Sequence, residues 1–113
     1  MATRRDPLDA PPTLAERLAK TRALTLALAE PLSDADATVQ PFADASPAKW
    51  HLAHTTWFFE TFVLRDAVPG YRPFDERFGF LFNSYYDVEG PRHPRPRRGM
   101  LSRPSLDEIR DWR

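Results

Sequence analysis

Apolar residues near the start of the chain recur at the three- and four-residue steps of an α-helix. Leucine and alanine follow this spacing from Leu14 onward, and Pro31 forbids the helix to continue. Thr13 and Glu16 form the TxxE pattern of a capping box, in which each side chain binds the other's backbone N–H. The pattern therefore predicts a first long helix over about residues 13–30.

A second helical pattern follows Ser46 and Pro47, an oxygen-bearing cap and a residue whose missing N–H costs nothing in a first turn. Its buried stripe is aromatic and includes one histidine: Trp50, Ala53, His54, Trp57, Phe58 and Thr61. We expect a second long helix to about Arg65, with His54 inside the stripe. The acidic link over residues 31–45 has two prolines and no stripe, which predicts a solvated surface loop.

The third apolar pattern follows a turn over residues 68–70. Its spacing predicts a helix over about residues 75–86, formed by Phe74, Phe78, Leu81, Phe82 and Tyr85. The alternation of Phe78, Phe80 and Phe82 also fits a strand, and Gly79 weakens a helix, so both interpretations stay open. Residues 89–104, rich in proline and arginine, are expected to be irregular. A second capping box, Ser105 and Glu108, predicts a last helix over residues 106–113.

These elements predict an all-α fold, an incomplete helical bundle. Two long antiparallel helices would be followed by a shorter aromatic helix, a Pro/Arg-rich loop and the start of a further helix. The aromatic segment between Phe42 and Tyr86 carries too much apolar surface for two helices to cover, and the last helix has only two turns. We therefore expect a flexible leader over residues 1–12 and a domain over 13–113 that is truncated at its C-terminus.

Composition and charge narrow the class of protein. The chain has 113 residues, 42% of them hydrophobic and 28% charged, which is typical of one soluble globular domain. It has no cysteine, which excludes disulfides, thiolate ligands and a cysteine nucleophile. Sixteen basic and 16 acidic side chains cancel, and no apolar run is long enough to span a bilayer. We expect a cytoplasmic protein with neither a nucleic acid nor a membrane as partner.

Three histidines are the candidate metal ligands. His51 and His54 lie three residues apart on the predicted helix, so both imidazoles could approach one ion. A packed core histidine with a backbone partner explains His54 as well. His93 lies in the loop after the aromatic element, and a three-histidine site would require that loop to fold back on the helix.

Polar groups beside the aromatic element are candidates for binding a small molecule. Arg95, Arg97 and Arg98 lie in the segment HPRPRRG, whose prolines stiffen the backbone, and guanidinium groups bind carboxylates and phosphates. A solvated basic loop, or one paired with the acidic link, explains the same pattern. Nucleic acid is the third candidate for what this arginine segment binds, because the aromatic residues are not interleaved with the arginines. Asn83, Tyr85 and Tyr86 either line a pocket or reach water from the edge of the core.

Two long segments carry a resemblance to a known family. SPAKWHLAHTTWFFETFVL (residues 46–64) and FGFLFNSYYDVEGPRHPRPRRGMLSRPSLDEI (residues 78–109) resemble the N-terminal part of EgtB-type ergothioneine-biosynthesis proteins. The resemblance implies a DinB-like bundle that precedes a second domain, with the active site between the two. It implies that His54 is one of three histidine ligands of iron(II), and His51 is not a ligand. The HxxxHxE motif that would supply the other two ligands is absent from this sequence.

The same resemblance implies an activity. These proteins are hercynine oxygenases, or sulfoxide synthases, which depend on iron(II) and O2 and join cysteine or gamma-glutamylcysteine to the imidazole of hercynine. Arg95 and Arg98 match the arginines that bind the carboxylate of the thiol substrate, and no catalytic residue lies in this chain. We expect the chain alone to be inactive. The alternatives are a DinB-like metal-dependent thiol S-transferase and a non-catalytic helical interaction module.

Overall fold

The computed structural model of the chain describes residues 10–113, and the all-α prediction is confirmed. Within this range no strand forms, and Phe42 and Ala45 make an isolated bridge. The part of the predicted leader that covers residues 1–9 lies outside the described residues. The chain divides after Pro31 into two compact units. Among the described residues, no helix has both the length and the apolar character that crossing a bilayer requires.

The first unit contains helix α1, Leu14–Ala29, as the apolar spacing predicts. Thr13 is its N-cap, and the predicted capping box forms. The Thr13 hydroxyl accepts from the N–H of Glu16 at 3.2 Å, and the Glu16 carboxylate accepts from the N–H of Thr13 at 3.3 Å. The helix ends at Glu30, just before Pro31. The antiparallel arrangement of two long helices stays a prediction.

The acidic link contains a short helix, so the prediction of a solvated loop was wrong there. Helix α2, Asp34–Thr38, begins at a capping box between Ser33 and Asp36 and buries Ala37 completely. The carboxylate of Asp34 does not bind water alone, because its Oδ1 accepts a hydrogen bond from the N–H of Leu106 at 2.8 Å. The local signal was the SDAD sequence, which has the reciprocal spacing of a capping box with aspartate in the place of glutamate.

Helix α3, Ala48–Phe59, continues through a π-helical segment, Glu60–Leu64, into α4, Arg65–Ala67. The predicted stripe is confirmed: Trp50, Ala53, Trp57 and Thr61 are buried, and His54 and Phe58 are half-buried. The expected cap at Ser46 was wrong. Pro47 is the N-cap, and the Ser46 hydroxyl accepts a hydrogen bond from Arg98.

Helix α5, Phe78–Phe82, is much shorter than the predicted helix over residues 75–86. Asn83 ends it: its Oδ1 accepts from the N–H of Tyr86, and its Nδ2 donates to the Tyr86 carbonyl, both at 2.9 Å. A buried asparagine that satisfies backbone groups in a turn competes with helix formation. The strand interpretation is not borne out, because Phe78, Phe80 and Phe82 all lie in α5.

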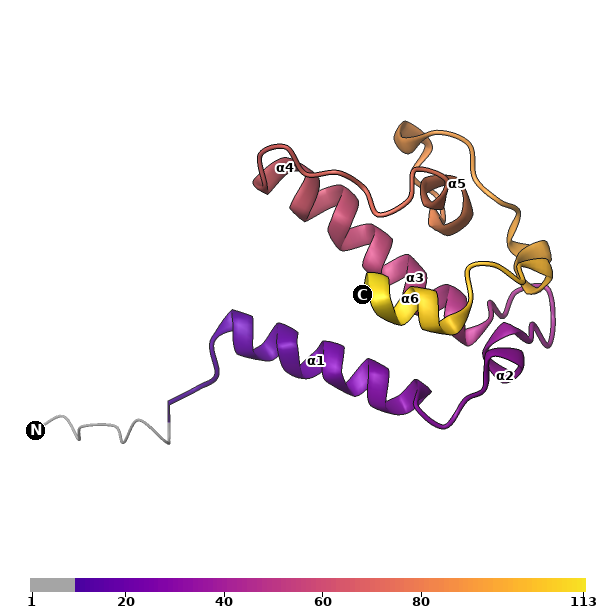
Figure 1. Ribbon diagram of the computed structural model, residues 1–113, viewed down its shortest axis with the longest axis horizontal. Coiled ribbons are helices and arrows are strands. Elements are labelled where there is room, and N and C mark those ends of the chain that lie inside the picture. The colour runs from indigo at the N-terminus through magenta and orange to yellow at the C-terminus, as the bar shows by residue number, and fades with distance from the viewer. Residues whose placement is uncertain (1–9) are drawn as a thin grey trace, which may run out of the picture. The chain divides into compact units, whose positions relative to one another are not determined.

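Two 3₁₀-helical segments follow, Asp87–Glu89 and Arg95–Met100. Only the second lies wholly within residues 89–104, which were expected to be irregular. Helix α6, Leu106–Trp112, follows the predicted capping box of Ser105 and Glu108. Within the second unit α3 is central, because α2, α5 and α6 all contact it (Figure 1). This arrangement places the stripe of α3 against the C-terminal end of α5.

Candidate functional site

The imidazole of His54 is held between two tryptophans of its own helix. Its ring stacks on Trp50 with centroids 4.7 Å apart and planes 10° apart, and on Trp57 with centroids 5.8 Å apart and planes 24° apart. These residues lie at steps of four and three along α3, so one face of the helix aligns all three rings. The stacking restricts rotation of the imidazole and leaves it half-buried.

The end of α5 fixes the tautomer of His54. Nδ1 of His54 lies 2.6 Å from the carbonyl oxygen of Phe82. A carbonyl only accepts, so Nδ1 carries the proton, and in the neutral ring Nε2 keeps a free lone pair. No group within residues 10–113 forms a hydrogen bond with Nε2. Trp50 binds the preceding carbonyl of α5, that of Leu81, through its Nε1–H at 3.0 Å.

Burial favours the neutral form of this imidazole. It lowers the pKa of His54 below the ordinary 6.5, the hydrogen bond to the Phe82 carbonyl partly opposes the shift, and the positive charge of Arg98 adds to it. A backbone carbonyl that orients one ring nitrogen is the usual support of a metal-binding histidine. The same bond also satisfies a carbonyl at a helix end, so a purely structural role uses the same geometry.

Arg98 lies in the core of the second unit. It is 3% exposed, its guanidinium carbon lies 3.5 Å from the centroid of the Trp50 ring, and its Nη1 donates to Ser46 at 2.9 Å. Its Nε is buried without a hydrogen-bond partner, and no carboxylate pairs with it within residues 10–113. Burial, with the charges of Arg95 and Arg92, lowers the pKa of Arg98 to about 10. It stays cationic at neutral pH.

Arg95 differs from Arg98 in its surroundings. It is exposed, and its backbone carbonyl accepts from Nε2 of Gln40 at 2.8 Å. The Oε1 of Gln40 accepts from the N–H of Gly99 at 2.7 Å, so one amide fixes both ends of the 3₁₀ turn. The arginine loop therefore binds the acidic link through neutral Gln40, and Ser46, just after the link, through Arg98. Among the described residues, no ion pair joins this loop to the link.

The three histidines do not converge. His51 is exposed on α3, in edge contact with Trp50, and burial, His54 and Arg98 all lower its pKa. His93 uses Nε2 to bind the carbonyl of Arg97 at 3.0 Å. The described residues contain no group of three histidine, aspartate or glutamate side chains that could hold a metal ion. His54 is suited to be one ligand, and a complete site is not formed by the described part of the chain.

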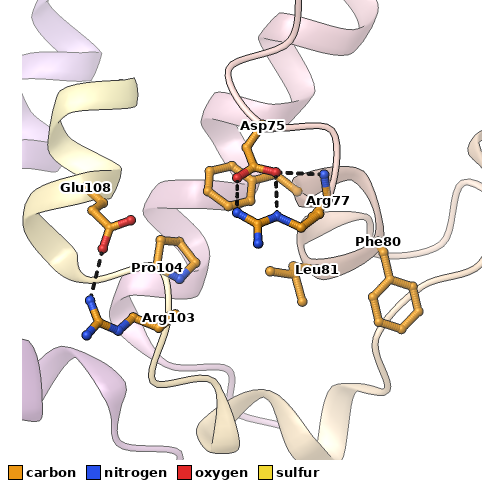
Figure 2. A pocket seen from close by; sticks show the side chains of 8 residues that line it. Asp75, Arg77, Phe80, Leu81, Arg103, Pro104 and Glu108 are labelled. Carbon is orange, nitrogen blue, oxygen red and sulfur yellow. Dashed lines mark hydrogen bonds and ion pairs between the residues drawn. The ribbon is translucent and has the colours of Figure 1, made fainter.

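One cavity of the second unit lies apart from these residues. It has a volume of about 390 Å³ and is lined by the apolar side chains of Phe78, Phe80, Leu81 and Pro104 and by two ion pairs. Figure 2 shows Arg77 on Asp75 at one side and Arg103 on Glu108 at the other. Both guanidinium groups are already paired, so this cavity offers no uncompensated charge to a ligand.

A model of the DinB superfamily matches residues 17–113, which is most of the chain. The chain belongs to the DinB superfamily. No curated protein matches it. Within this DinB domain, the match covers all the helices of the second unit together with His54, Arg95 and Arg98.

Sequence reasoning overlooked two buried ionisable residues of this DinB domain, Lys49 and Glu60. Glu60 is 5% exposed and receives hydrogen bonds at Oε2 from Tyr71, Phe74 and Trp112. A signal was present, because Glu60 lies three residues after Trp57 and so extends the aromatic face. The pattern was treated as apolar, and a charged residue on a core face is itself a candidate site.

Proposed function

We propose that this chain is the N-terminal DinB domain of an EgtB-type hercynine oxygenase. This enzyme would use iron(II) and O2 to join cysteine or gamma-glutamylcysteine to the imidazole of hercynine as a sulfoxide. The resemblance of residues 46–64 and 78–109 supports the proposal, and the DinB match is consistent with it. The observation that carries it is the geometry of His54, whose Nδ1–H is bound by Phe82 while Nε2 stays unpartnered among residues 10–113.

The fit of this chain to an iron site is partial. DinB proteins are often metal-dependent, and His54 presents one imidazole nitrogen in the tautomer that a metal requires. The described residues bring no second or third donor to it. In such enzymes the metal would bind the thiolate and dioxygen. The residues of this chain would hold Nε2 in place, since Trp50 and Trp57 flank the ring.

Arg95 and Arg98 are proposed to bind the carboxylate of the thiol substrate. Arg98 supports this because it is a buried cation without a carboxylate partner in the described residues, and buried charges are usually paired. Arg95 is exposed and meets a ligand without rearrangement. Arg98 is 3% exposed, so a carboxylate can reach its guanidinium group only after the groups that cover it move. We therefore assign first contact with the carboxylate to Arg95.

Translation of the reading frame downstream of Arg113 tests the proposed enzyme class. An HxxxHxE motif followed by a second domain is the expected result, and its absence would contradict the proposal. The protein encoded by that whole frame should bind one iron(II). His54→Ala should weaken this binding at least tenfold, and the matched variant His51→Ala on the same helix should leave it unchanged. Equal losses in both variants would remove the ligand role of His54.

Kinetics of that protein test the arginine role. Arg95→Ala should raise the KM for the thiol at least tenfold and leave the KM for hercynine within about twofold, because a charge-assisted bond to a carboxylate contributes about 1.5–3 kcal/mol. Arg17→Ala, in α1, is the control for the loss of one positive charge. Equal effects of Arg95→Ala on both substrates would contradict the assignment. Thiol transfer without consumption of O2 would favour the S-transferase.

A further inference from the structure

A second buried ion of this domain lies at the junction of α3 and the π-helical segment. The Oε2 atom of Glu60 accepts from the hydroxyl of Tyr71 and the Nε1–H of Trp112, both at 2.8 Å, and from the N–H of Phe74 at 3.2 Å. All three donors are neutral. Within residues 10–113 no lysine or arginine forms an ion pair with Glu60. A buried carboxylate is ordinarily paired with a cation, and this one is not.

The other oxygen of the same carboxylate is free to bind. Oε1 of Glu60 accepts no hydrogen bond within residues 10–113, and it is not one of the atoms that the protein encloses completely. Glu60 lines a cavity of about 260 Å³, which we call the Glu60 cavity. A side chain that is 95% buried, with one oxygen unpartnered among residues 10–113, therefore lines a space large enough for a small molecule.

The charges around the Glu60 cavity select a cation. Four carboxylates and one guanidinium line it, those of Glu60, Asp75, Glu76, Glu89 and Arg65. Arg65 is bound by Glu89 through two hydrogen bonds of 2.9 and 3.1 Å, and Asp75 is bound by Arg77. Within each of these two pairs the opposite charges cancel. The charges of Glu60 and Glu76 are left to attract a positive ligand.

The remaining walls identify the kind of cation. The described residues provide no group of three ligating side chains, so a divalent metal lacks the donors that it needs. Trp57 and Tyr71 supply aromatic surface, which favours an organic ammonium group. Oε1 of Glu60 requires a hydrogen-bond donor, and a primary ammonium has N–H groups that a quaternary ammonium lacks.

We propose that the Glu60 cavity binds a small primary alkylammonium compound. Its N–H donates to Oε1 of Glu60, and its alkyl chain lies along Trp57. The bound cation supplies the charge partner that Glu60 lacks within the described residues. This site does not depend on iron or on the arginine loop, so it stands whether or not the proposed oxygenase function is correct.

NMR titration of the full chain with n-butylammonium chloride tests this site. The indole N–H signals of Trp112 and Trp57 are expected to shift saturably, because Trp112 donates to Glu60 and Trp57 lines the cavity. The signal of Trp50, which donates to the carbonyl of Leu81, serves as the internal reference. 1-Butanol, tetramethylammonium chloride and NaCl, each titrated over the same concentrations, should bind at least tenfold more weakly than n-butylammonium. Equal binding by any of the three, or the absence of saturation, would overturn the proposal.

Two variants separate the charge of Glu60 from general electrostatics. Glu60→Gln keeps the volume and an acceptor oxygen and should weaken binding of butylammonium at least tenfold. Asp66→Asn removes the same charge from α4, outside the cavity, and should leave the affinity within twofold. Equal affinities of Glu60→Gln and the unchanged protein would refute the role of Glu60.

Gly79→Ala keeps the test decisive if Glu60→Gln does not fold. Gly79 lines the cavity, and a Cβ atom there would meet only Nε1 of Trp57, at an ordinary 3.8 Å. The variant should therefore fold and should narrow the cavity, which weakens binding of butylammonium several-fold. An unchanged affinity would show that the ligand binds elsewhere and would overturn the proposal.

Discussion

Four residues act on the side chain of His54 in different ways. Phe82 fixes the proton on Nδ1, the two tryptophans hold the ring, and Arg98 opposes a second proton. Together they keep a neutral imidazole in one orientation. Arg98 and Glu60 share a different property: each is a buried ionisable residue without an ionic partner in the described residues. Such groups are retained where they bind a ligand or where polar contacts offset their desolvation.

Acidification should destabilise the chain through His51 and His54, the two histidines of α3. The pKa values of His51 and His54 are both lowered from 6.5, mainly by burial, so the unfolded chain binds protons that the folded chain does not. The free energy of unfolding, measured in urea, is expected to fall as the pH decreases from about 7.5 through 6.5. The double variant His51→Gln/His54→Gln should lose most of this slope between pH 7.5 and about 5.5. A free energy of unfolding that increases as the pH falls over this range would contradict the lowered pKa values of the two histidines.

At the scale of elements, short helices and turns place the site. Helix α5 has only five residues, yet its last two carbonyls bind Trp50 and His54 of α3. The 3₁₀ turn Arg95–Met100 carries Arg98 to the face of Trp50. Neither element could form alone in water, because helices this short are not stable in isolation. Tertiary hydrogen bonds therefore hold the groups that surround the imidazole.

Gly99→Ala tests how tightly the 3₁₀ turn docks. A Cβ atom at residue 99 would lie 2.7 Å from Cβ of Gln40, whose amide binds both ends of the turn. Overpacking of this kind costs about 1–3 kcal/mol, so the urea midpoint should fall. Gly79→Ala is the matched control, because its Cβ meets only an ordinary contact and alanine favours a helix. Equal stability of the two variants would show that the contact with Gln40 is not close.

At the scale of the whole chain, the sequence predicted the long elements and their faces. The stripe of α3 and the capping boxes at Thr13 and Ser105 are local patterns, and local patterns can be read from a single sequence. The predicted helix over residues 75–86 failed because the side chain of Asn83 captured backbone groups of Tyr86. The predicted cap at Ser46 failed because its hydroxyl binds Arg98, 52 residues away.

For the candidate site, too, the local features could be predicted from the sequence and the long-range contacts could not. The inward position of His54 follows from helical spacing, whereas its carbonyl partner lies on another element and leaves no mark in the sequence. Burial of Arg98 on Trp50 was likewise not visible, since a proline-rich basic loop suggests exposure. The DinB superfamily assignment agrees with the resemblance found in the sequence, and the hercynine oxygenase activity is our proposal.

The most direct test of this account is the protonation state of the two nitrogens of His54. Two-bond ¹H–¹⁵N correlation spectra of the chain at about pH 7.5 distinguish a protonated from an unprotonated ring nitrogen, with His51→Gln and His93→Gln providing assignment. We predict a protonated Nδ1 and an unprotonated Nε2, as the bond to Phe82 requires. A His54 ring with its proton on Nε2 would contradict the geometry on which the proposed metal ligand depends.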